Sequence, residues 1–213
     1  QDEVSQEVAV LILPALQGKE QDRIQTKSPA SFSAWDCYLK ALAIFNQTWA
    51  GSDNVESNDD VFLKFCDDAI AGDPNLCDAY VLKARRIYGN LYSSGYQHKR
   101  KELELQFHEL AFQAYSIDPY NPEAVSIYSR SFNVKKDYPQ RLKYAKQALD
   151  LNPSHAGSNY DYGLALLNEK RFQETEAHIG RAMEMNPIGK RSYEGLLPIV
   201  YMAMANSDKS LEW

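Results

Sequence analysis

The segment SHAGSNYDYGLALLNEKRFQETEAHIGRAMEMNP at 154–187 reads as two helices joined by a short turn near 168–171. In each half, apolar or small residues recur every three or four positions, which places them on one face of an α-helix. Gly163 in the first half and Ala182 in the second half belong to these faces. Because two helices approach closely only where side chains are small, we expect the helices to cross at these two residues.

Prolines mark the end of this segment and of others like it. MEMNP at 183–187 nearly repeats LDLNP at 149–153. A proline cannot continue a helix, and it disfavours the helical conformation of the residue before it. Five prolines lie at intervals of 45, 45, 34 and 34 residues: Pro29, Pro74, Pro119, Pro153 and Pro187. They predict four repeated units and a partial fifth, with these bounds: 30–74, 75–119, 120–153, 154–187 and 188–213.

The first two units are longer than the other two. Their additional residues fall at 46–60 and 89–104, where Gly, Ser and charged residues indicate loops. We expect longer connections between the helices there, with extended helices beside them.

The repeated positions resemble the tetratricopeptide repeat, a helix–turn–helix unit with small and aromatic residues at fixed places and a proline at its end. The last complete unit carries the pattern in five residues: Tyr162, Gly163, Leu166, Ala182 and Pro187. Lys83 and Arg141 depart from it, because apolar or small residues are expected at their positions. The resemblance implies an all-α fold, a right-handed α–α superhelix of about four to five such repeats plus an N-terminal helix.

The N-terminal part, 1–29, is expected to form a helix over 2–23 and then a linker, because its apolar residues fall on one helical stripe. QDEV at 1–4 and AWDCYLK at 34–40 resemble the junction between a TolB-like α/β domain and tetratricopeptide repeats in certain bacterial proteins. Such proteins begin with a class III adenylate cyclase domain or with a winged-helix DNA-binding domain. Since the chain does not begin with Met, we expect a fragment of such a protein.

The resemblance implies a non-catalytic interaction or regulatory module of a larger bacterial signalling protein, with an adenylate cyclase as the leading parent. The alternatives are the sensory region of a winged-helix transcriptional activator and a free-standing scaffold of repeats. The sequence has no P-loop, GxGxxG, HExxH or GxSxG motif, and its histidines have no partner at ligand spacing. We therefore expect no enzyme activity, metal or cofactor in this chain.

Charge and composition limit which partners this chain can bind and where in the cell it can lie. The formal net charge of −6 and the pI of about 5.3 argue against non-specific binding of nucleic acid, which needs a basic face. The longest apolar runs, at 8–16 and 196–205, are too short to span a bilayer. We expect no membrane span in this chain, and a soluble fragment that is cytoplasmic or lies on the periplasmic side of a membrane-anchored parent.

Stacked helix pairs of this kind form a concave groove, which the first helix of each pair lines. The proline register places three cations at equivalent positions of successive units: Lys40, Arg85 and Arg130. The other residues expected in the groove are Tyr88, Asn133, Tyr160, Asn168 and Tyr201. Because Arg presents a fork of donors to carboxylates, the cations predict a protein or peptide partner that is acidic. The alternative is local pairing, as between Asp36 and Lys40 one helical turn apart.

The partial unit at 188–213 has a first helix with an apolar face, and the chain stops in the second helix at SDKSLEW. Solenoids normally need a polar cap over such a face. We therefore expect a symmetric homodimer through the truncated C-terminal end.

Overall fold

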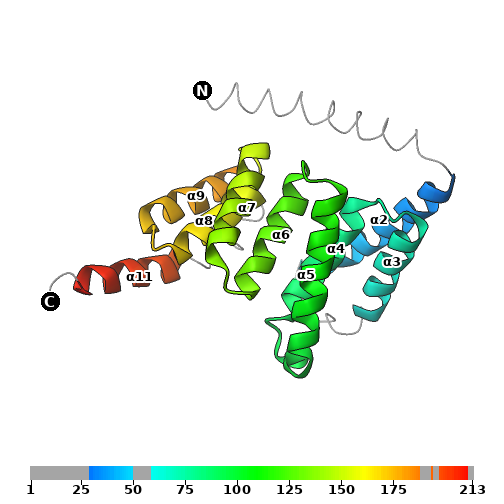
Figure 1. Cartoon of the computed structure of the whole chain (residues 1–213), viewed down its shortest axis with the longest axis horizontal. Helices are drawn as coiled ribbons and strands as arrows, with labels where there is room; N and C mark the ends of the chain where they lie inside the picture. The colour runs from blue at the N-terminus through cyan, green and yellow to red at the C-terminus, as the bar shows by residue number, and fades with distance from the viewer. Residues whose placement is uncertain (1–28, 50–58, 188–192, 194–196, 211–213) are drawn as a thin grey trace. The chain divides into compact units, whose positions relative to one another are not determined.

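The computed structural model describes residues 29–49, 59–187, 193 and 197–210 (Figure 1). All regular structure in these residues is helical, with nine α-helices and one 3-10 helix, which confirms the all-α prediction. The helix predicted over 2–23 lies outside the described residues, as do parts of the connection at 46–60 and of the unit at 188–213. The chain divides into two compact units, Gln1–Leu76 and Cys77–Trp213, which are described separately.

Unit 1 contains a pair of helices, α2 (Pro29–Trp49) and α3 (Asp59–Gly72), which pack against each other. Small side chains are fully buried on both helices, since Ala41 and Ala69 are both 0% exposed. A Cβ atom added at Gly72 would lie 3.0 Å from the Cβ of Ala34, so the two helices approach closely at this point.

Unit 2 is a helical solenoid of three helix pairs and one further helix. Its α-helices have these bounds: α4 (Cys77–Asn90), α5 (Arg100–Ile117), α6 (Pro122–Val134), α7 (Tyr138–Leu151), α8 (Ala156–Asn168), α9 (Phe172–Met185) and α11 (Leu197–Ser210). Each first helix packs on the second helix of its pair, and α5 packs on α6 as α7 packs on α8 (Figure 1). The first helices also meet one another, α4 with α6 and α6 with α8.

The long connection predicted at 89–104 is present in unit 2. A 3-10 helix, η1 (Ser94–Lys99), fills its middle, and α5 begins directly after it. The helix α5 has 18 residues, whereas α7 and α9 have 14 each, so the additional sequence also extends the second helix, as predicted.

Local signals set the helix ends. Asn121 caps α6, because its side-chain oxygen accepts from the backbone N–H groups of Glu123 and Ala124 at 2.9 and 3.2 Å. Three residues that precede the repeated prolines end α5, α7 and α9 with φ between −134° and −147°: Asp118, Asn152 and Asn186. This extended backbone is what a following proline favours, so the prolines end these helices as predicted.

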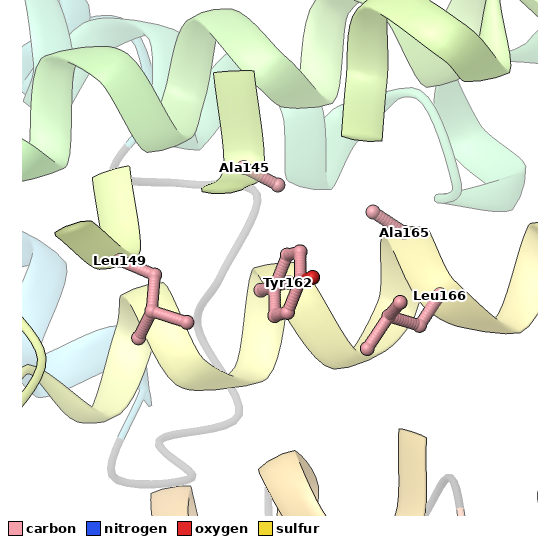
Figure 2. Packing of buried hydrophobic residues seen from close by; sticks show 5 residues of the cluster. All are labelled: Ala145, Leu149, Tyr162, Ala165 and Leu166. Carbon is pink, nitrogen blue, oxygen red and sulfur yellow. The ribbon is translucent and has the colours of Figure 1, made fainter. Parts of the chain in front are cut away.

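Small residues hold the helix pairs together. Ala114, Ala148 and Ala182 occupy equivalent places on the second helices of unit 2, and each is 0% exposed. A Cβ atom added at Gly163 of α8 would lie 3.3 Å from the carbonyl oxygen of Thr175 in α9. Close approach of the two helices at Gly163 is therefore confirmed, and a close crossing at Ala182, which is buried, stays a prediction. Between successive pairs, buried apolar residues of α7 and α8, both small and large, fill the core (Figure 2), with these members: Ala145, Leu149, Tyr162, Ala165 and Leu166.

Candidate functional site

Most of the residues predicted for a groove lie on the first helices of unit 2. We call the surface that they form on α4, α6 and α8 the first-helix face. Its members are Arg85, Tyr88, Glu123, Arg130, Asn133 and Tyr160. Contacts between helices join them, because the Arg130 guanidinium on α6 lies 5.6 Å from the ring centroid of Tyr88 on α4. The face is therefore a continuous set of cations, carboxylates and phenols.

Arg85 is held by a carboxylate of the next helix pair. Its Nη2 lies 2.8 Å from Oε2 of Glu123, and the two side chains are 33% and 36% exposed. The other Glu123 oxygen, Oε1, lies 3.3 Å from Nε2 of His155, the residue that caps α8. Glu123 thus bridges a cation on α4 and an imidazole at the start of α8.

The hydrogen bonds of His155 determine which of its ring nitrogens carries the proton. Its Nδ1 accepts from the backbone N–H of Ser158 at 3.2 Å, so Nε2 carries the proton and donates to Glu123. Burial alone raises the pKa of Glu123, but the hydrogen bond from His155 and the charge of Arg85 outweigh burial and lower the pKa to about 2. Glu123 is therefore a carboxylate at neutral pH.

Arg130 has a different and more enclosed partner. Its Nε donates to Oδ1 of Asp161 at 2.8 Å, and Asp161, on α8, is 2% exposed. The hydroxyl of Ser126 donates to the other carboxylate oxygen, Oδ2. Burial lowers the pKa of Arg130, but the charge of Asp161 and the hydrogen bond to it raise the pKa, and the net shift is upward, so Arg130 stays charged. Both oxygens of Asp161 are thus engaged within unit 2.

Arg141 is a buried cation next to this pair. It lies on α7, is 4% exposed, and donates from Nη1 to the side-chain oxygen of Asn133 on the first-helix face. Its own carbonyl oxygen accepts from the hydroxyl of Ser129 at 2.8 Å, which ties α7 to α6. Burial lowers the pKa of Arg141, and the charge of Arg130 adds to this effect. The sequence signal was a cation at a small-residue position, but it did not indicate that the side chain reaches this face.

Tyrosines cover the apolar side of the first-helix face. The hydroxyls of Tyr88 and Tyr92 are 3.4 Å apart, and the ring of Tyr88 packs on Phe107 of α5 with centroids 5.0 Å apart. Tyr160 packs on Tyr193 with centroids 5.0 Å apart. Burial raises the pKa of Tyr88 and of Tyr160, so both hydroxyls keep their protons at neutral pH and can donate.

Comparisons with known proteins fit this geometry. No family model matches the chain. TTC0263, a thermophilic TPR protein of Thermus thermophilus, superposes with a TM-score of 0.58 at 15% identity, over 76% of this chain and 79% of that one. The first TPR domain of human RPAP3 gives a TM-score of 0.51 at 16% identity, over 64% of this chain and 98% of that one. The chain has the tetratricopeptide-repeat fold.

One curated sequence also matches part of the chain. It is anaphase-promoting complex subunit 3 of Schizosaccharomyces pombe, which is 22% identical over 120 residues. The match covers 56% of this chain and 18% of that protein, so the chain spans less than a fifth of this relative.

Three predicted groove residues are not among the members of the first-helix face: Lys40, Asn168 and Tyr201. Lys40 belongs to unit 1, where it is exposed and its Nζ lies 5.7 Å from the ring centroid of Phe65. Asn168 ends α8, and its buried Nδ2 has no hydrogen-bond partner among the described residues. Tyr201 on α11 donates to the Glu176 carboxylate of α9 at 2.8 Å. Lys40 therefore belongs to the other unit, and Tyr201 lies on α11 rather than on the helices that form the first-helix face.

The described part of the chain carries neither a candidate metal site nor a membrane helix. It contains no group of three or more His, Cys, Asp or Glu side chains placed to hold a metal ion. Within the same residues, no helix is long and apolar enough to cross a membrane. Among the described residues, no disulfide joins Cys37, Cys66 and Cys77.

Proposed function

We propose that this chain is a non-catalytic interaction module that binds an acidic peptide segment of a protein partner along the first-helix face. The observation that supports the proposal is the exposure of Arg85. This cation on the first-helix face and its carboxylate partner, Glu123, are each about one third exposed. Repeat solenoids use the surface of their stacked helices for binding, and Arg is the residue best suited to carboxylates. In this proposal Arg85 makes the first contact with the partner.

Binding would exchange one carboxylate for another. Because the Arg85–Glu123 pair is partly exposed, an incoming Asp or Glu can compete with Glu123 for Arg85, while His155 still holds the other Glu123 oxygen. Arg130 cannot exchange in this way, because its partner Asp161 is buried and fully engaged. Arg130 would instead hold α6 and α8 in register, while the hydroxyl of Tyr160 donates to the partner.

Peptide binding tests the proposal. The probe is a surface-bound panel of Asp- and Glu-rich decapeptides, each paired with its Asn- and Gln-containing twin. We expect the acidic members to bind and Arg85→Glu to weaken them by about tenfold or more, because a charge-assisted hydrogen bond contributes about 1.5–3 kcal/mol. Glu123→Gln should strengthen binding, since it frees Arg85.

The matched control is Arg181→Glu, which makes the same charge change at an exposed position of the second helix α9. Binding should change little in this variant. Equal losses in Arg85→Glu and Arg181→Glu would show that the peptides respond to net charge and would overturn the proposal.

The larger protein to which the module belongs is also a proposal. The residues at 1–4 and 34–40 favour a bacterial signalling protein with a TolB-like domain, led by an adenylate cyclase. A winged-helix transcriptional activator or a free-standing scaffold are the alternatives, and the cytoplasm and the periplasm are the proposed compartments. The gene sequence upstream of Gln1 decides among them, because a cyclase domain shows metal-binding aspartates and an activator shows a winged helix.

A further inference from the structure

The connections inside the helix pairs of unit 2 lie along one edge of the solenoid. Each connection reverses the chain, so α4, α6 and α8 run in the same direction, and α6 packs on both α4 and α8. The connections that follow these three helices therefore share an edge, which we call the turn edge: 91–99, 135–137 and 169–171. The connections between successive pairs, 118–121 and 152–155, lie at the opposite edge.

Cations gather at the turn edge. The segments 99–104, 135–137 and 169–174 contain seven Lys and Arg against five Asp and Glu, in a chain whose net charge is −6. The connections at the opposite edge, 118–121 and 152–155, contain no Lys or Arg. One edge of an acidic protein is therefore basic.

Most of these cations have no carboxylate partner. Arg100 and Arg171 are paired on their own helices, with Glu104 at 3.0 Å and with Glu174 at 2.6 Å. Within the described residues, no ion pair engages five exposed lysines of the turn edge and of the first turn of α5: Lys99, Lys101, Lys135, Lys136 and Lys170. The unpaired cations of this edge are thus all lysines, whose compact ammonium groups bind phosphate as point charges.

Local stability does not account for these lysines. Lys136 and Lys170, 34 residues apart, have φ of 57° and 58°, a conformation in which glycine is favoured over an L-residue. Lys99 precedes α5 and Lys101 lies in its first turn, where the positive end of the helix dipole disfavours cations. Residues kept against their local preference indicate a use for their side chains.

Exposed apolar side chains lie beside the lysines. Tyr138 begins α7 directly after the 135–137 connection and is 38% exposed, and Tyr92 of the 91–99 connection is 59% exposed. Leu105, in the second turn of α5, is 68% exposed. Lysines next to exposed Tyr and Leu are typical of surfaces that lie between the headgroups and the acyl chains of a bilayer.

We propose that the turn edge binds the surface of an anionic lipid bilayer. The five lysines meet the headgroup phosphates, and Tyr92, Leu105 and Tyr138 enter the boundary with the acyl chains. Nucleic acid fits less well, because single strands are bound along a groove with aromatic platforms, whereas the turn edge is a row of three connections and Leu105 has no ring on which a base could stack. The lysines are not members of the first-helix face, so the inference does not rest on the proposed function.

Co-sedimentation of the full chain with large unilamellar vesicles tests the proposal. One set of vesicles contains phosphatidylglycerol and phosphatidylcholine in equal parts, and the other contains phosphatidylcholine alone. We expect saturable binding to the anionic vesicles, binding to the neutral vesicles that is weaker by about tenfold or more, and release from the anionic vesicles as salt is raised. Equal binding to both sets, or binding to neither, would overturn the proposal.

Lys136→Gly with Lys170→Gly separates the charge from the fold. Vesicle binding should weaken by about tenfold or more, since each lysine near an anionic bilayer contributes about fivefold. The melting temperature should stay the same or rise, because glycine relieves the left-handed backbone. The matched control is Lys143→Gln with Arg181→Gln, which removes the same charge from exposed positions of α7 and α9 and should bind almost as the natural chain does. Equal losses in the two double variants would refute the turn edge as the binding surface.

Two further measurements distinguish a bilayer from other polyanions. Leu105→Ser with Tyr138→Ser should weaken vesicle binding several-fold, because a bilayer has an apolar layer beneath its charged surface. Single-stranded oligouridine, at the same concentration of phosphate groups, should bind at least several-fold more weakly than the anionic vesicles. Vesicle binding that ignores the loss of Leu105 and Tyr138, or RNA binding that is as tight and depends equally on Lys136 and Lys170, would overturn the bilayer assignment.

Discussion

Two lysines, Lys136 and Lys170, have a left-handed backbone conformation. Lys136 and Lys170 have φ of 57° and 58°, and each lies in the turn between the first and second helix of its pair. This left-handed conformation costs an L-residue about 1–2 kcal/mol and costs glycine almost nothing. The short turn at 168–171 was predicted from sequence, but its left-handed residue was not, because lysine gives no such signal.

Replacing Lys136 with Gly should therefore raise the free energy of unfolding by about 0.5–1 kcal/mol, which is the relief of strain less the flexibility that glycine adds to the unfolded chain. Chemical denaturation measures the change. The matched control is Lys135→Gly at the preceding residue, where φ is −77°, and it should lower the stability. A loss of stability in both variants would contradict the strain at Lys136.

The Glu123 carboxylate predicts an acid-sensitive contribution to stability. Its pKa is about 2 in the folded protein, against an ordinary value of 4.5. Because the folded pKa is the lower one, the stabilisation is present above pH 4.5 and is lost as the pH falls toward 2. The melting temperature of the natural chain should therefore fall more than that of Glu123→Gln between pH 5 and 2.5. His108 and His178 are present in both proteins, so the difference between the two curves reports on Glu123 together with its contacts to His155 and Arg85.

At the scale of the helix, small residues decide the packing. Ala182 on α9 is 0% exposed, at the same position as Ala148 on α7 and Ala114 on α5. Ala182→Leu should lower the free energy of unfolding by about 1–3 kcal/mol, because the crossing cannot accept a larger side chain without shifting. Ala177→Leu, on the exposed side of the same helix, should have almost no effect. Equal effects of the two substitutions in urea denaturation would refute a close crossing at Ala182.

Sequence reasoning predicted the helix ends and crossings because both follow local rules. A proline ends a helix whatever surrounds it, and Ala or Gly at a fixed step permits close approach. The pairing of the cations is not local. Arg85 pairs with Glu123 and Arg130 pairs with Asp161. In both pairs the carboxylate lies on the first helix of the next helix pair, not one turn away on the same helix. Arg141 was harder still, because the path of its side chain depends on Asn133, a residue of a different helix.

At the scale of the whole molecule, the helix α11 carries apolar side chains that face solvent. Val200 is 0% exposed, whereas Ile199 is 47% exposed and Met202 is 61% exposed. Tyr201, between them in sequence, is 48% exposed although its hydroxyl bonds to Glu176. The helix α11 belongs to the C-terminal end of the chain, through which we expect a symmetric homodimer. We therefore propose that this exposed apolar surface forms the dimer contact.

Sedimentation equilibrium tests the dimer over a wide range of protein concentration. The natural chain should associate as concentration rises, and Ile199→Glu with Met202→Glu should keep it monomeric, because a symmetric contact would place four new charges at one interface. The matched control is Leu105→Glu with Phe112→Glu, which puts the same charges on exposed apolar positions of α5. Association should persist in this control. A natural chain that stays monomeric at the highest concentration, or a control that also stops associating, would exclude α11 as the dimer surface.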